Sequence, residues 1–69
     1  MSVAKVIEII SASPTSFDDA VKQGLARAAD SVSDVTGAWI KDQSVQVSDG
    51  QITEYRVALK VTFILRGGA

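Results

Sequence analysis

Residues 52–65 (ITEYRVALKVTFIL) most constrain what this chain can fold into, because they read as one unbroken β-strand of fourteen residues. Side chains alternate along it, with Tyr55, Val57 and Leu59 on the same face as Val61 and Phe63, which is the two-residue period of a strand. A strand of this length spans roughly 46 Å, whereas a compact domain of this size has a radius of gyration near 11 Å, as an order of magnitude. The strand must therefore bend sharply around the rest of the domain, or protrude and pair with another copy.

Two shorter strands are predicted before it. Residues 3–10 (VAKVIEII) are rich in Val and Ile, and residues 38–47 (AWIKDQSVQV) read as a second strand after a break at residues 11–15 and a helix. The dipeptide Asp49-Gly50 then separates two strand-like runs, which is the signal of a tight hairpin.

A single helix is predicted between the first two strands. Ser16 is a suitable N-cap, and Asp19 follows three residues later in an arrangement close to a capping box. Gly24 lies in mid-helix, where we expect it to allow the close approach of a strand. Apolar residues recur at three- and four-residue spacing and form one stripe: Phe17, Val21, Leu25, Ala28 and Val32.

The predicted architecture is α+β with element order βαββ, in one domain over residues 1–69. One helix covers only one face of a three-stranded antiparallel sheet, and the other face still carries Trp39, Ala58 and Ile64. A chain of 69 residues buries too little surface to be very stable alone, and without cysteine or histidine it has no disulfide and no common transition-metal ligand. Self-association is the remaining way to stabilise it.

Composition excludes several classes of function. The net charge of −1 argues against a nucleic-acid partner, and no apolar run is long enough to span a membrane. The N-terminal residues do not read as a signal peptide, so a cytoplasmic protein is expected. Without His or Cys, neither a Ser-His nor a Cys-His nucleophile is available, so we do not expect an enzyme.

The element order, the motif SASPTSF at residues 11–17 and the ending EYRVALKVTFIL at residues 54–65 resemble the dodecin family. The resemblance implies a sheet wrapped around one helix and twelve copies in a hollow shell of tetrahedral symmetry. Most of the family bind flavins in pairs at subunit interfaces, stacked on a tryptophan and hydrogen-bonded to a glutamine. Their inferred role is storage and quenching of flavin rather than catalysis.

The resemblance also assigns ligand-binding residues to this chain: Gly37, Trp39, Asp42 and Arg56. When the chain is aligned with flavin-binding dodecins on Asp42-Gln43, Gly37 takes the place of the stacking tryptophan. Trp39 follows two residues later on the same face of the strand. Arg56 takes the place of the glutamine, but a guanidinium cannot accept a hydrogen bond. Both positions differ from the flavin-binding pattern, so the chain is closer to the branch that lacks the tryptophan, part of which is associated with calcium.

Two hypotheses follow for the ligand. The first is a homododecamer that sequesters riboflavin or FMN, with Trp39 as the stacking platform; the alternative is a flavin-free shell that binds Ca²⁺ or other ions at interfaces or symmetry axes. Trp39 is also interpretable as a plain interface residue, and Arg56 as part of an ion pair between subunits.

No residues are assigned as metal ligands from the sequence. EF-hand spacing is absent, and the candidate carboxylates come in three pairs: Asp18 with Asp19, Asp30 with Asp34, and Asp42 with Asp49. The second pair is expected to share one side of the helix near its C-terminus. A calcium site at a symmetry axis is favoured over one within a single copy, because each carboxylate is then multiplied.

Overall fold

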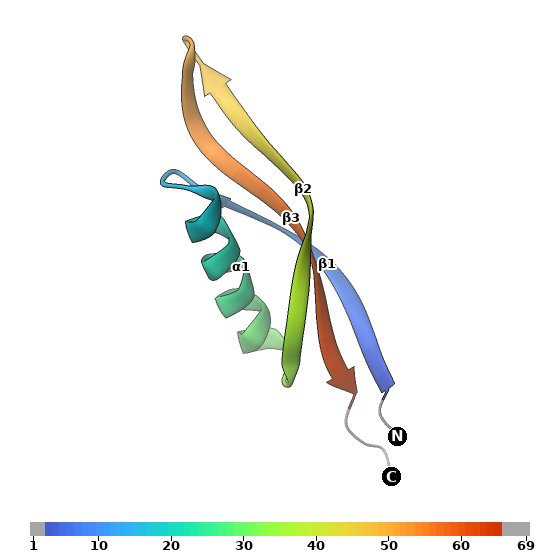
Figure 1. The fold of residues 1–69 in the computed structure, drawn as a ribbon. Helices are drawn as coiled ribbons and strands as arrows, with labels where there is room; N and C mark the ends of the chain where they lie inside the picture. The colour runs from blue at the N-terminus through green and yellow to red at the C-terminus, as the bar shows by residue number, and fades with distance from the viewer. Residues whose placement is uncertain (1–2, 66–69) are drawn as a thin grey trace.

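The computed structural model describes residues 3–65. Its elements are β1 (Val3–Ser13), α1 (Phe17–Ser31), β2 (Val35–Ser48) and β3 (Gln51–Leu65). The three strands form one antiparallel sheet in the order β1-β3-β2, and α1 lies against one face of it (Figure 1). The predicted α+β fold with βαββ order is therefore confirmed.

The first two strands are longer than their local sequence predicts. β1 runs to Ser13 rather than ending at Ile10, and β2 begins at Val35, three residues before the predicted start. Both extensions are paired with the long β3: Ser13 lies opposite Tyr55, and Val35 lies opposite Phe63. The predicted break at residues 11–15 began too early, because a neighbouring strand supplies a ladder that local turn preferences do not reveal.

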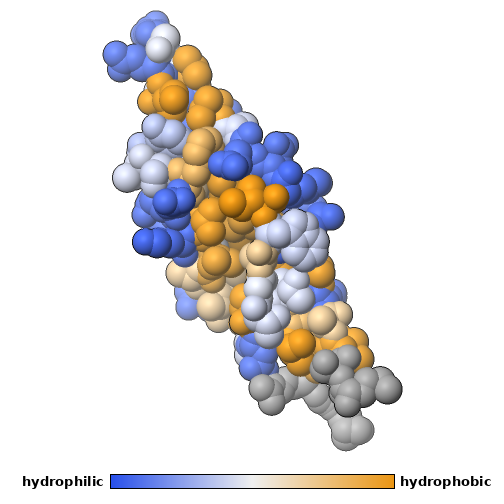
Figure 2. Space-filling view, in the orientation of Figure 1, coloured by the Kyte–Doolittle hydropathy of each residue, from blue (hydrophilic) through white to orange (hydrophobic). Residues whose placement is uncertain are grey.

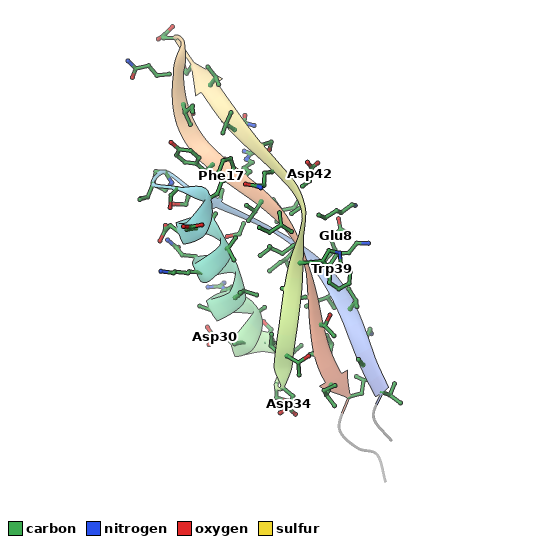
Figure 3. The ribbon with its side chains drawn as sticks, viewed as in Figure 1. Glu8, Phe17, Asp30, Asp34, Trp39 and Asp42 are labelled. Atoms are coloured by element: carbon green, nitrogen blue, oxygen red, sulfur yellow. The ribbon has the colours of Figure 1, made fainter. Side chains whose placement is uncertain are left out.

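The start of α1 is as predicted, and its end is not. Ser16 caps the helix, since its Oγ accepts a hydrogen bond from the Asp19 amide at 3.0 Å. Val32, assigned to the helical stripe, is instead the extended C-cap, with φ −132° and ψ 147°. Asp34 follows outside the helix with φ 61°, so the prediction that it shares a helix side with Asp30 is wrong (Figure 3).

The core lies between α1 and the inner face of β3. The buried apolar residues are Ala20, Ala28, Val57, Leu59 and Val61. At the centre of this contact, a Cβ on Gly24 would lie 2.9 Å from Ser11 Cβ and 3.1 Å from Leu59 Cδ1. Glycine therefore lets the helix approach the sheet closely, as its mid-helix position predicts.

The β2–β3 hairpin projects well beyond α1 (Figure 1). The molecule measures 55 × 19 × 13 Å, and its radius of gyration is 14.3 Å, against about 11 Å for a compact domain of this length. The hairpin turns at Asp49 and Gly50 with φ of 52° and 75°, the two positive φ angles of the tight turn that Asp-Gly predicts. The long strand was expected either to bend sharply around the domain or to protrude, and the structure shows that it protrudes. Its pairing with another copy stays a prediction.

Candidate functional site

All four predicted ligand-binding residues lie on the face of the sheet that is turned away from α1, called here the outer face. Residues directly opposite one another in a ladder point to the same side. Gly37 lies opposite Thr62, Trp39 opposite Lys60 and Asp42 opposite Ala58, all on the outer face. Arg56 joins them between Ala12 of β1 and Ser44 of β2. Figure 3 shows Trp39 and Asp42 on the side away from the helix.

A β-bulge in β2 sets the order of side chains on this face. The register shifts between Ile40 and Asp42, which leaves Lys41 as the extra residue. With simple alternation, Asp42 would point to the face opposite that of Trp39. Because of the bulge, both side chains point to the same face. Lys41 reaches across the sheet, and its Nζ lies 3.0 Å from Glu8 Oε1 on β1.

Trp39 is half-exposed and already has a partner. The Nζ of Lys60 lies 5.8 Å from the centroid of its ring, within the range of a cation–π contact. Lys60 also lies opposite Glu8 across the β1–β3 ladder. The contacts of Lys60 with Trp39 and of Lys41 with Glu8 depend on strand order and on the bulge, which the local sequence does not reveal.

Asp42 and Arg56 are brought together, and the other two predicted residues are not. They line a shallow hollow of about 190 Å³ with Ser44, Ala58, Val57 and Ile10. The guanidinium of Arg56 is held by Glu54 of the same strand, with 2.5 Å between Nε and Oε1. An ion pair between subunits was one interpretation of Arg56; the observed pair with Glu54 lies within one chain.

The hollow is small for a cofactor. Sites for drug-sized ligands occupy roughly 300–1000 Å³, which exceeds the 190 Å³ observed. Gly37 lies outside this hollow, and a Cβ built on it meets no described atom within 4 Å. A larger ligand on the outer face of one chain would therefore contact the described residues on one side only.

The carboxylates of one chain are dispersed. Within residues 3–65 no group of three or more Asp, Glu, His or Cys side chains lies close enough to hold a metal ion. Asp19 accepts hydrogen bonds from Ser13 Oγ and Gln23 Nε2, and Glu8 and Glu54 are in ion pairs. Asp42 is exposed, and its Oδ1 accepts only the amide of Gln43. Ca²⁺ takes six to eight oxygen ligands, so the described part of one chain does not fit a complete calcium site.

No helix in the described part of the chain has the length and apolar character needed to cross a lipid bilayer.

Comparison with known proteins agrees with the fold. The family model named Dodecin matches residues 3–66. A calcium dodecin from Mycobacterium tuberculosis is 48% identical over 67 residues, which cover 96% of this chain and 93% of that protein.

Solved structures give the same result. A dodecin from Streptomyces davaonensis superposes with a TM-score of 0.92 at 29% identity, covering 96% of this chain and 97% of that one. The structure of the calcium-chelating calcium dodecin of Mycobacterium tuberculosis, which has a calcium-binding site, superposes with a TM-score of 0.82 at 42% identity, covering 99% and 97%. With this fold, these strands and these matches, the chain belongs to the dodecin family.

Proposed function

We propose that this dodecin is a non-catalytic homo-oligomeric shell that binds Ca²⁺ at junctions between its subunits. The observation that carries this proposal is the 48% identity, over 96% of the chain, with a protein named calcium dodecin. The dispersed carboxylates of residues 3–65 add a constraint: these residues of one copy do not gather enough side-chain oxygens, so we expect a second copy to contribute ligands.

The surface of the single chain supports assembly. Large apolar residues lie exposed on both faces and along the hairpin: Val3, Val6, Ile10, Trp39, Ile40, Val47, Ile52 and Leu65. Soluble monomers rarely leave so much apolar surface in contact with water. A dodecamer is the stoichiometry that the family resemblance implies, and a cytoplasmic location stays a prediction.

Asp42 is the carboxylate that we assign to the shared site. It lies on β2, an edge strand of the sheet, and makes no ion pair with any described residue. The hydroxyl-bearing Ser44 lines the same hollow, so a second copy placed against this edge would meet at least two oxygen-bearing side chains. Hard oxygen donors of this kind are the ligands that Ca²⁺ prefers.

Isothermal titration of the metal-free shell with Ca²⁺ tests the proposal. We expect saturable binding with fewer than one ion per chain, and a loss of about tenfold or more in affinity in Asp42→Asn, since charge count tunes calcium affinity. Asp30→Asn is the matched control and should leave affinity unchanged, because Asp30 lies at the far end of α1. Absence of binding at millimolar Ca²⁺ refutes the calcium proposal; equal losses in both variants refute the role of Asp42.

Flavin binding is the second candidate, favoured by one observation. Trp39 is 51% exposed, and open space lies beside it at Gly37 on the same face. Against it, Lys60 lies over the indole ring and Arg56 is paired with Glu54. Titration with riboflavin or FMN separates the candidates: quenching of Trp39 fluorescence at micromolar flavin supports flavin binding, whereas unchanged fluorescence excludes it and leaves the calcium proposal intact.

A further inference from the structure

The turn between β2 and β3 places an aspartate directly before a glycine at one end of the molecule. Asp49 and Gly50 have φ angles of 52° and 75°, and the paired residues Ser48 and Gln51 close the turn around them. The turn lies beyond α1 (Figure 1), and Figure 2 shows that this end of the molecule is hydrophilic. The helix therefore does not cover the two turn residues.

The two groups of this turn that can react with one another are both accessible. The Asp49 carboxylate is exposed and makes no hydrogen bond or ion pair with any residue from 3 to 65. The Gly50 amide makes no backbone hydrogen bond within the same residues. A Cβ built on Gly50 meets no described atom within 4 Å, so no neighbouring side chain shields the amide nitrogen.

We propose that Asp49 is a site of spontaneous isomerisation to isoaspartate. The main-chain nitrogen of Gly50 attacks the Asp49 side-chain carboxyl carbon, Cγ. A C–N bond forms, and the carboxyl hydroxyl leaves with the amide proton as one molecule of water, which gives a cyclic succinimide. Water then adds to the main-chain carbonyl of Asp49 and breaks its bond to the Gly50 nitrogen, so that the chain runs through Cγ. The two steps need no oxidant, metal or cofactor.

The surroundings of Asp42 show why the reaction is expected at Asp49 in particular. Asp42 is also exposed, but the next residue, Gln43, carries a side chain that crowds its nitrogen and belongs to a strand paired with β3. The Gln43 amide is also held by Asp42 Oδ1 at 3.0 Å. Ring closure requires the main chain to leave its present conformation, and such local opening costs least at an exposed end on which no other element packs.

Isomerisation would loosen the end of the hairpin. Isoaspartate adds a methylene group to the main chain, whereas a tight turn of this kind requires two residues of normal connectivity with positive φ. The pairing of Val47 with Ile52 lies next to the turn and would weaken first. The inference does not depend on the proposed calcium site.

Peptide mapping of the aged, natively assembled protein tests the site. Trypsin cleaves after Lys41 and Arg56, so one peptide, residues 42–56, carries both Asp42 and Asp49. Electron-transfer fragmentation distinguishes isoaspartate from aspartate at each position. We expect the isoaspartate fraction at Asp49 to exceed that at Asp42 by about tenfold or more. Equal fractions at the two positions, or no isoaspartate at Asp49, overturn the inference.

Asp49→Gly is the matched variant for the structural consequence. It has no carboxyl group to react, and a Gly-Gly turn accepts positive φ at both positions. Ageing should accelerate amide hydrogen exchange of the hairpin end, residues 47–52, by about tenfold in the isomerised unaltered protein and leave the variant unchanged. Equal acceleration in both proteins would show that the loosening has a cause other than Asp49.

Discussion

Gly24 fixes the distance between α1 and the sheet. A methyl group there would meet Ser11 Cβ at 2.9 Å, and this atom belongs to the strand rather than to the end of a flexible side chain. The sequence predicts that Gly24 allows the close approach of a strand, but it does not identify the opposing residue. That residue is Ser11, which belongs to β1 because the strand extends past Ile10.

Gly24→Ala is therefore expected to destabilise the protein even though alanine favours helices. Helix propensity alone would add about 1 kcal/mol of stability, and overpacking costs about 1–3 kcal/mol, so we expect a net loss of about 1 kcal/mol in the free energy of unfolding. Ala26→Gly, on the exposed side of α1, is the matched control and should lose about 1 kcal/mol from propensity alone. Urea unfolding measures both variants, and a stabilised Gly24→Ala protein would contradict the close contact.

The junction between β1 and α1 depends on one buried hydroxyl. Ser13 is 1% exposed; its Oγ donates to Asp19 Oδ2 at 2.6 Å and accepts the Thr15 amide at 3.0 Å. Asp19 also accepts a hydrogen bond from Gln23 Nε2 at 2.7 Å. The last residue of the strand, the turn and the first helical turn are thereby joined in one network.

Ser13→Ala should loosen this junction. Asp19 would lose one partner and the Thr15 amide its acceptor, so we expect a loss of about 1–3 kcal/mol in the free energy of unfolding. Ser33→Ala is the control, because Ser33 is exposed and its side chain makes no hydrogen bond with residues 3–65. The network is unimportant for stability if thermal unfolding shows the two variants to be equally stable.

At the scale of elements, features governed by neighbouring residues were predictable. The cap at Ser16 and the Asp49-Gly50 turn depend on a few adjacent residues, and both are confirmed. Features governed by a partner strand were not: the extension of β1 to Ser13 and the bulge at Lys41 arise from pairing with β3. The arrangement of the candidate site was the least predictable feature, because Asp42 shares a face with Trp39 only as a result of the bulge.

At the scale of the molecule, the single chain is an incomplete unit. It exposes 4885 Å² of surface, whereas a compact monomer of 7.3 kDa exposes about 4200 Å². The additional exposed surface has two causes. The molecule is elongated, with a projecting hairpin, and the helix covers β1 and β3 far more than β2. Association would bury apolar surface that the helix leaves open, and folding and assembly are then expected to be coupled.

Ile10 gives the sharpest test of that coupling. It is 75% exposed and lies on the outer face, so in a single chain Ile10→Asp should fold at little cost. In an assembly the new Asp side chain would be a buried charge, which is costly. We therefore expect light scattering to show the mass of one chain, and thermal unfolding to show a lower melting temperature. Lys22→Asp, on exposed helix surface, is the control. An Ile10→Asp protein that keeps the oligomeric mass would place the interfaces elsewhere.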